Sequence, residues 1–297
     1  MKDLEILEKL EFVCPSIKSD ASAMFLKNQM DKYYFRSGLD FLVQHNGYRP
    51  KNIHLVIGPA GAGKSSLLFA QIFDLIKFNS KTLGDTCKIG LYLSEEKIER
   101  FKNSLVKMGL YGAEKSKLTD FLSCFSEKEF KMKNNILKLH GETIIKILRE
   151  FIKRENIKIL FIDNLTTTDP YLDDRHEEIS PMAKQLSSLA DEFNIPIVIY
   201  AHTKGEVNGP DFTMEDIRQK KTITNLAEFV YLVHRFNSTE IPSFLQTRKY
   251  RGYPIKNYFH QLTYNKDMGI VAGMMGSSLS SYRMKLKEYR EIGKNGI

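Results

Sequence analysis

The chain is poor in cysteine and has no long apolar run, and both absences exclude classes of protein. Its 297 residues hold three widely separated cysteines, Cys14, Cys87 and Cys124. This number and spacing indicate free thiols in a reducing cytosol and exclude a disulfide framework or a metal knuckle. No apolar stretch reaches the roughly 20 residues that a membrane helix needs, and the charged first residues do not resemble a signal peptide. We therefore expect a cytoplasmic protein with no membrane partner.

Positive charge is in excess over negative charge. The sequence has 44 lysines and arginines against 36 aspartates and glutamates, a formal net charge of +8. This balance favours a polyanionic partner such as nucleic acid, while a solvated lysine-rich surface would give the same count. With 42% hydrophobic residues, the chain can bury one large α/β core or two small ones.

Apolar strands and helical stretches alternate through the middle of the sequence. The strand candidates are near-continuous apolar runs, as expected of strands buried on both faces of a parallel sheet; they lie at 53–58, 89–94, 157–163 and 195–202. Helical patterns lie between them at 64–78, 95–108, 142–155 and 179–193. The alternation predicts a doubly wound α/β domain.

The two ends of the chain have different patterns. Helical spacing near the start predicts a helical segment over 1–34 with an apolar stripe of Leu4, Leu7 and Leu10. The sequence after 228 is strand-rich, and its strands either continue the same sheet or form an antiparallel extension. The segment 110–140 is polar and irregular, without a functional interpretation. We therefore divide the chain into a helical segment, an α/β domain and a basic tail, at 1–34, 35–275 and 276–297.

A glycine-rich loop between the first strand and the first helix predicts nucleotide binding. Residues 58–65 match G-x-x-x-x-G-K-[ST]. The small residues let backbone N–H groups point toward phosphate oxygens, and the helix N-terminus adds partial positive charge. Lys64 is expected to reach the β- and γ-phosphates, and Ser65 to bind Mg²⁺. We predict an ATP and Mg²⁺ site whose nucleotide contacts are Gly58, Pro59, Ala60, Gly61, Ala62, Gly63, Lys64, Ser65 and Ser66.

Acidic residues follow two other strands of the same domain. Asp163 ends the run IKILFID, where the carboxyl end of a buried strand is placed to hold the Mg²⁺ shell. Glu95 and Glu96 follow LYLS, where a carboxylate can polarise the attacking water; both also suit the first turn of a helix. Spacing alone does not choose between the two glutamates.

The order of these elements resembles the RecA-fold motor domain of hexameric replicative DNA helicases, superfamily 4, which includes bacterial, phage T7, mitochondrial and plasmid-encoded types. The resemblance covers about residues 35–272 and is carried by an ordered set of motifs: LYLSEE (91–96), ILFIDNL (159–165), VIYAHTKG (198–205), D-I-R (216–218), K-x-R (249–251) and LTYNKDMGI (262–270). Two places depart from the family: Gln219-Lys220 replace the usual Gly-Ser, and Glu228 stands where an aspartate is common.

The resemblance implies a RecA-like P-loop NTPase fold, α/β with a mostly parallel sheet flanked by helices and a strand-rich C-terminal extension. It also implies roles. His202 would report hydrolysis to the loop after it, and Arg251, assisted by Lys249, would reach the γ-phosphate of a neighbouring subunit. The loop 204–222 would face the ring channel and hold single-stranded DNA through Lys204, Arg218, Lys220 and Lys221.

The function implied by the resemblance is an ATP-driven, ring-forming DNA helicase or translocase in replication. Its partners would be single-stranded DNA, further copies of the chain in a hexamer, and a replication loader or initiator. The alternative is a RecA-fold ATPase of recombinase-like or regulatory type, which uses ATP to assemble or switch without unwinding. A metabolic kinase would leave His202 and the K-x-R element without a role.

Overall fold

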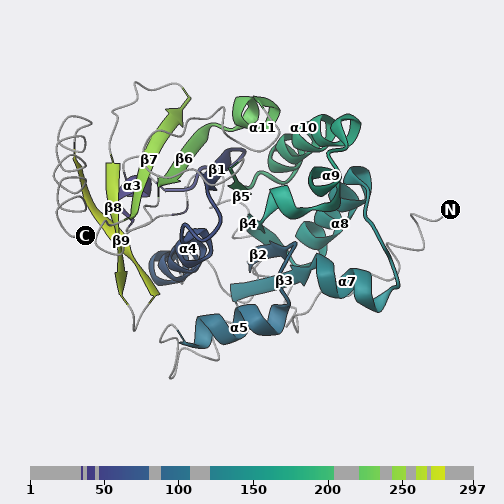
Figure 1. Ribbon diagram of the computed structural model, residues 1–297, viewed down its shortest axis with the longest axis horizontal. Helices are drawn as coiled ribbons and strands as arrows, with labels where there is room; N and C mark the ends of the chain where they lie inside the picture. The colour runs from purple at the N-terminus through teal and green to yellow at the C-terminus, as the bar shows by residue number, and fades with distance from the viewer. Residues whose placement is uncertain are drawn as a thin grey trace, which may run out of the picture.

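A nine-stranded sheet runs through the part of the chain that the structure describes (Figure 1). The computed structural model describes residues 35, 39–43, 47–79, 88–107, 121–203, 221–234, 243–251, 259–265 and 269–277. The strand order is β3-β2-β4-β5-β1-β6-β7-β8-β9. The strands are β1 (Ile53–Gly58), β2 (Lys88–Leu93), β3 (Leu122–Ser126), β4 (Ile157–Asp163), β5 (Ile197–His202), β6 (Phe229–His234), β7 (Ser243–Tyr250), β8 (Phe259–Asn265) and β9 (Gly269–Ser277).

The six strands from β3 to β6 are all parallel, as the apolar runs predicted. Every residue of β1 is buried, so neither face of this strand meets solvent. The register sets Gly58 opposite His202 and Leu93 opposite Asp163. Because parallel strands end at a common edge, the segments that follow these residues converge there.

The remaining strands, β7 to β9, pair antiparallel, with β7 beside β6. Both expectations for the late strands are therefore met in part: β6 joins the parallel sheet and β7–β9 extend it. The reversal carries the end of β7 to the other edge of the sheet, since Tyr250 lies opposite Phe229, the first residue of β6.

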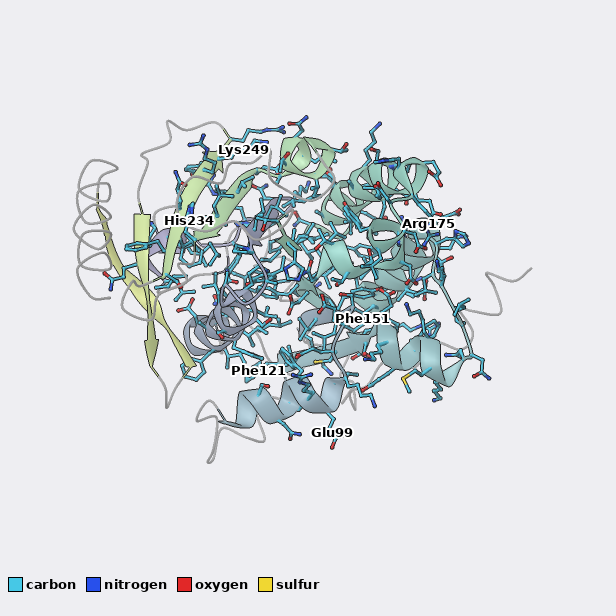
Figure 2. The ribbon with its side chains drawn as sticks, viewed as in Figure 1. Glu99, Phe121, Phe151, Arg175, His234 and Lys249 are labelled. Carbon is cyan, nitrogen blue, oxygen red and sulfur yellow. The ribbon has the colours of Figure 1, made fainter. Side chains whose placement is uncertain are left out.

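Helices cover both faces of the sheet. Side chains of β1 alternate between two hydrophobic layers, with Leu55 and Ile57 in one and Val56 in the other. The first layer contains residues of α8 (Gly141–Arg154), α10 (His176–Phe193) and α11 (Lys221–Leu226), among them the fully buried Phe151 (Figure 2). The second contains residues of α3 (Asp40–Val43), α4 (Lys64–Asn79) and α5 (Ile98–Lys107).

The structure corrects the prediction of an irregular segment at 110–140. Residues 122–126 form edge strand β3, and α7 (Glu127–Lys133) follows directly. The strand is short and contains Ser123 and Ser126, so its own pattern is weak, and pairing with β2 along its whole length stabilises it. Ser126 also caps α7, because its hydroxyl accepts a hydrogen bond from Glu129 N at 3.2 Å.

Other expectations need smaller changes or lie outside the described residues. The helix predicted from 95 begins at Ile98, so Glu95 and Glu96 belong to a loop. The predicted helical segment 1–34 falls outside the described residues, and so does the predicted tail 276–297 except for its first two residues, which belong to β9. Among the helices within them, none combines the length and the apolar character that crossing a membrane requires.

Candidate nucleotide-binding site

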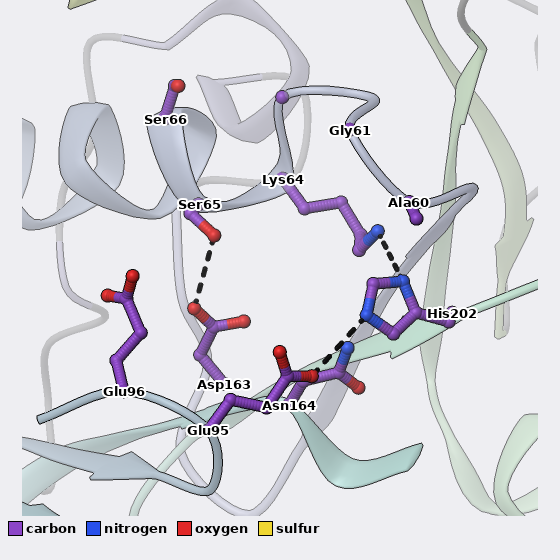
Figure 3. A pocket seen from close by; sticks show the side chains of 11 residues that line it. Ala60, Gly61, Lys64, Ser65, Ser66, Glu95, Glu96, Asp163, Asn164 and His202 are labelled. Atoms are coloured by element: carbon purple, nitrogen blue, oxygen red, sulfur yellow. Dashed lines mark hydrogen bonds and ion pairs between the residues drawn. The ribbon is translucent and has the colours of Figure 1, made fainter. Parts of the chain in front are cut away.

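A cleft of about 480 Å³ lies at the carboxyl edge of the parallel strands (Figure 3). The loop after β1, the loop after β2 and the ends of β4 and β5 contribute to it. Its walls are formed by Ala60, Gly61, Gly63, Lys64, Ser65, Ser66, Glu95, Glu96, Asp163, Asn164 and His202. The structure therefore brings together predicted phosphate-binding, acidic and sensor residues from four separate segments.

The glycines of the loop after β1 are required by its backbone. Gly63 has a φ of 88°, a left-handed conformation that residues with a side chain rarely adopt. Gly58 has no space for a side chain, because a Cβ there would lie 2.8 Å from the carbonyl oxygen of Val233. The loop can therefore keep this tight path only with glycine at both positions.

Lys64 is buried at the start of α4 and bridges the loop to β5. Its ammonium donates hydrogen bonds to the carbonyl oxygens of Gly58 at 2.8 Å and Pro59 at 2.7 Å. It also lies 2.9 Å from Nδ1 of His202. Burial lowers the pKa of Lys64 to about 8, so the side chain remains largely protonated at neutral pH.

Ser65 and Asp163 bring two oxygen donors together on the other side of the cleft. The Ser65 hydroxyl donates to Oδ2 of Asp163 at 3.4 Å. Burial raises the pKa of Asp163 to about 6; Lys64 opposes this rise, and the charges of Glu95 and Glu96 add to it. Hard oxygen ligands of this kind, open to a cleft that can hold phosphates, fit Mg²⁺.

The two glutamates after β2 have different surroundings. Oε1 of Glu95 lies 3.6 Å from Nε2 of His202, and the interaction with this ring is the main cause that lowers the pKa of Glu95. Glu96 lies at 3.6 Å from Nε of Arg100, on the first turns of α5. Glu95 therefore contacts His202, which in turn contacts Lys64, whereas Glu96, in the loop before α5, is paired with Arg100 of that helix.

A second set of hydrogen bonds joins the ends of β2, β4 and β5. The Ser94 hydroxyl accepts from Asn164 N at 2.9 Å and donates to Asn164 O at 2.8 Å. The Asn164 side-chain oxygen accepts from the Thr166 hydroxyl at 2.7 Å, and Thr166 accepts from His202 N at 3.0 Å. No sequence motif predicted a role for Ser94, Asn164 or Thr166, although the first two adjoin predicted site residues.

Residues of β3 and α7 hold the glutamate loop from its other side. The Ser126 hydroxyl donates to the carbonyl oxygen of Glu96 at 2.8 Å. Glu129 accepts a hydrogen bond from Ile98 N at 3.0 Å. The segment that the sequence left without a function thus supports the backbone on which Glu95 and Glu96 stand.

The K-x-R pair lies away from this cleft. Lys249 donates to the carbonyl oxygens of Thr224 at 2.7 Å and Asn225 at 3.0 Å, and Arg251 donates to Asn225 O at 2.9 Å. These contacts are at the amino edge of β6, whereas the phosphate-binding loop leaves the carboxyl end of β1, a strand of roughly 20 Å. The structure does not bring Lys249 or Arg251 to the cleft of the same chain.

The structure describes only the last part of the segment that carries the predicted DNA contacts. Lys204, Arg218 and Lys220 lie outside the described residues. Lys221 is the first residue of α11, and its side chain is not described. These four residues therefore stay a prediction.

Together the sheet order and the loop at the end of β1 define a RecA-like P-loop NTPase. The chain belongs to the family described as DnaB-like helicase C terminal domain, which matches residues 36–257. Membership of this family implies an enzyme that hydrolyses nucleoside triphosphates.

Two curated relatives are replicative DNA helicases DnaB. The protein from Treponema pallidum (strain Nichols) is 31% identical over 111 residues, which are 37% of this chain and 25% of that protein. The protein from Mycoplasma pneumoniae (strain ATCC 29342 / M129 / Subtype 1) is 27% identical over 95 residues, 30% of this chain and 20% of that protein. The matched regions thus span a quarter of these relatives or less.

A solved structure shows the same fold. A KaiC-like protein from the archaeon Pyrococcus horikoshii OT3 superposes with a TM-score of 0.57 at 15% identity, over 80% of this chain and 96% of that chain. At this identity the likeness concerns the fold alone, and it confirms the predicted RecA-like architecture.

We expect Asp163→Asn to raise the melting temperature of the nucleotide-free protein. The pKa of Asp163 is raised from 3.8 to about 6 in the folded chain. Above about pH 6 the folded chain therefore contains a carboxylate in surroundings that favour the neutral carboxyl, and this lowers the free energy of unfolding. The gain should be full at about pH 8, shrink below about pH 6 and vanish below about pH 4, where the carboxyl is protonated in both states.

Melting curves of both proteins across this pH range provide the measurement. Asp191→Asn, which changes an exposed residue of α10, is the matched control and should leave the melting temperature nearly unchanged. A lower melting temperature of Asp163→Asn at high pH would contradict the expectation.

Proposed function

We propose that the chain is an ATP-driven, ring-forming DNA helicase or translocase that moves on single-stranded DNA in replication. One observation carries the proposal. The cleft brings together Lys64, Ser65, Asp163 and Glu95, to which we assign phosphate binding, metal binding and water activation, while the K-x-R pair of the same chain lies at the opposite edge of the sheet. A cleft built in this way is completed by a cation from another copy.

Lys64, Ser65 and Asp163 would hold the triphosphate and its cation. Phosphate oxygens are charged acceptors and bind an ammonium more strongly than the carbonyl oxygens of Gly58 and Pro59, so Lys64 would turn to them. Ser65 and Asp163 would hold Mg²⁺, which neutralises charge on the β- and γ-phosphates when bound. Ser66 lines the same cleft, and the N–H groups at the start of α4 would donate hydrogen bonds to these phosphates.

Glu95 is the carboxylate best placed to polarise the attacking water. Its lowered pKa keeps it ionised at neutral pH, so it can accept a hydrogen bond from water. Because the ammonium of Lys64 donates to Nδ1 of His202, the ring proton belongs on Nε2, facing Glu95. His202 thus joins the phosphate-binding lysine to the base, which suits a sensor of hydrolysis.

The loop after His202 connects the cleft to the proposed DNA contacts. His202 ends β5, α11 begins at Lys221, and residues 204–220 connect the two elements along the sequence. We propose that Lys204, Arg218, Lys220 and Lys221 contact phosphates of a single DNA strand in the channel of a hexamer. A replication loader or initiator would place such a ring on DNA.

The first prediction separates the two glutamates. Glu95→Gln should lower the turnover number for ATP by about 10²-fold or more, because the amide no longer accepts the water proton, and leave nucleotide affinity unchanged. Glu96→Gln is the matched control and should change turnover little, since Glu96 pairs with Arg100. Steady-state ATP hydrolysis and equilibrium nucleotide binding give both quantities. The opposite ranking of the two variants would reverse the assignment.

The second prediction concerns action between subunits. Arg251→Ala should bind ATP normally and hydrolyse it about 10³-fold more slowly, since charge on the γ-phosphate then lacks its fixed cation. Mixing it with Lys64→Ala protein should restore turnover, because one variant supplies the intact P-loop and the other supplies Arg251. Native mass measurement confirms the composition of the mixed rings. Mixed rings without restored turnover would exclude a finger in trans.

The third prediction separates a helicase from the alternative ATPase. The wild-type chain should separate a forked DNA duplex with a single-stranded tail in the presence of ATP and Mg²⁺, and Lys64→Ala should not. A recombinase-like or regulatory ATPase would hydrolyse ATP with single-stranded DNA and leave the fork intact. If single-stranded DNA did not stimulate ATP hydrolysis, the result would argue against both the helicase and the recombinase-like or regulatory ATPase.

A further inference from the structure

Glu228 stands between the strand that carries the phosphate-binding loop and the K-x-R pair. It directly precedes β6, and its Oε2 accepts a hydrogen bond from Ile53 N at 2.8 Å. Its own backbone N–H donates to Ile53 O at 3.1 Å. Backbone and side chain together fasten Glu228 to the first residue of β1.

The other carboxylate oxygen of Glu228 faces Arg251. Oε1 lies 3.7 Å from Nη1 of Arg251, and the Arg251 N–H donates to the carbonyl oxygen of Glu228 at 2.9 Å. On its other side the guanidinium donates to Asn225 O at 2.9 Å, at the carboxyl end of α11. Carbonyl oxygens at a helix end carry partial negative charge, so Arg251 is held between two negative groups.

Lys249 contacts the same helix end. Its ammonium donates to Thr224 O and Asn225 O, and Figure 2 shows the residue beside α11. Burial lowers the pKa of Lys249, the nearby charge of Arg251 lowers it further, and the charge of Glu228 opposes both. The carboxylate of Glu228 thus stabilises two neighbouring cations that repel each other.

We infer that Glu228 is a positioning residue for Arg251. Its carboxylate fixes the direction in which the guanidinium points away from the subunit. The inference rests on the proposed function, in which Arg251 acts on a neighbouring subunit. The Arg251 side chain is 59% exposed, and a half-exposed ion pair contributes little to folding stability. It can still restrict a long side chain to the one orientation that reaches a phosphate, because its carboxylate is tied to the sheet through Ile53.

A structural role of Glu228 at the start of β1 is the competing explanation, and Glu228→Gln separates the two. Glutamine keeps an oxygen that can accept from Ile53 N–H and removes the charge that faces Arg251. We expect the turnover number for ATP to fall about tenfold while the KM for ATP and the melting temperature stay unchanged. Glu142→Gln, which removes an exposed carboxylate of α8, is the control and should behave as wild type.

Mixed rings then show on which active site Glu228 acts. In rings of Glu228→Gln and Lys64→Ala subunits, an intact P-loop can receive Arg251 from a subunit that retains Glu228, so turnover should rise above that of Glu228→Gln alone. In rings of Arg251→Ala and the double variant Glu228→Gln/Lys64→Ala, an intact P-loop can receive Arg251 only from a subunit without the carboxylate. Turnover should then stay about tenfold below that of Arg251→Ala mixed with Lys64→Ala.

The outcomes decide separately on Glu228 and on the finger. The positioning role would be overturned if Lys64→Ala and Glu228→Gln/Lys64→Ala restored the turnover of Arg251→Ala equally. A raised KM or a lowered melting temperature in Glu228→Gln would also overturn it. Failure of the reference mixture, Arg251→Ala with Lys64→Ala, would instead reject the finger in trans and this role of Glu228 with it. All mixtures carry the same proportion of Lys64→Ala subunits, so inactive subunits affect them equally.

Discussion

Hydrogen bonds between parallel strands fix the register of the sheet, and the nucleotide cleft depends on that register. Gly58 at the end of β1 lies opposite His202 of β5, and Leu93 of β2 lies opposite Asp163 of β4. Because side chains alternate between the two faces, a slip of one residue in β5 would turn His202 away from Lys64. Close packing in both hydrophobic layers opposes such a slip, since each layer is filled by side chains of particular shape.

The charged groups at this edge of the sheet lower the stability of the folded chain, and they favour the binding of a charged ligand. Burial lowers the pKa of Lys64 and raises that of Asp163, so each group is held in surroundings that disfavour its charged form. A bound triphosphate and a divalent cation would supply charges opposite to those of Lys64 and Asp163. Perturbed groups in one cleft are typical of functional sites, where some stability is given up for binding and catalysis.

Much of the fold and part of the site could be predicted from local sequence. The apolar runs predicted β1, β2, β4 and β5, because strands buried on both faces have a distinct composition. The different surroundings of Glu95 and Glu96 could not be predicted, since they depend on contacts with segments distant along the chain. Ser126, 30 residues from Glu96, holds the loop through one hydroxyl. Glu228, 175 residues from Ile53, showed only as a departure from a family pattern, without the contact that explains it.

The reversal of chain direction after β6 separates the two halves of the proposed catalytic machinery. Had β7 joined the sheet as a parallel strand, its end would lie at the carboxyl edge, beside the phosphate-binding loop. Because β7 is antiparallel, Tyr250 pairs with the first residue of β6 and Arg251 follows at the amino edge. Any contact between Arg251 and a nucleotide must therefore involve a nucleotide bound to another chain. The same edge holds the carboxyl end of α11, where the carbonyl oxygen of Asn225 accepts a hydrogen bond from the Arg251 guanidinium.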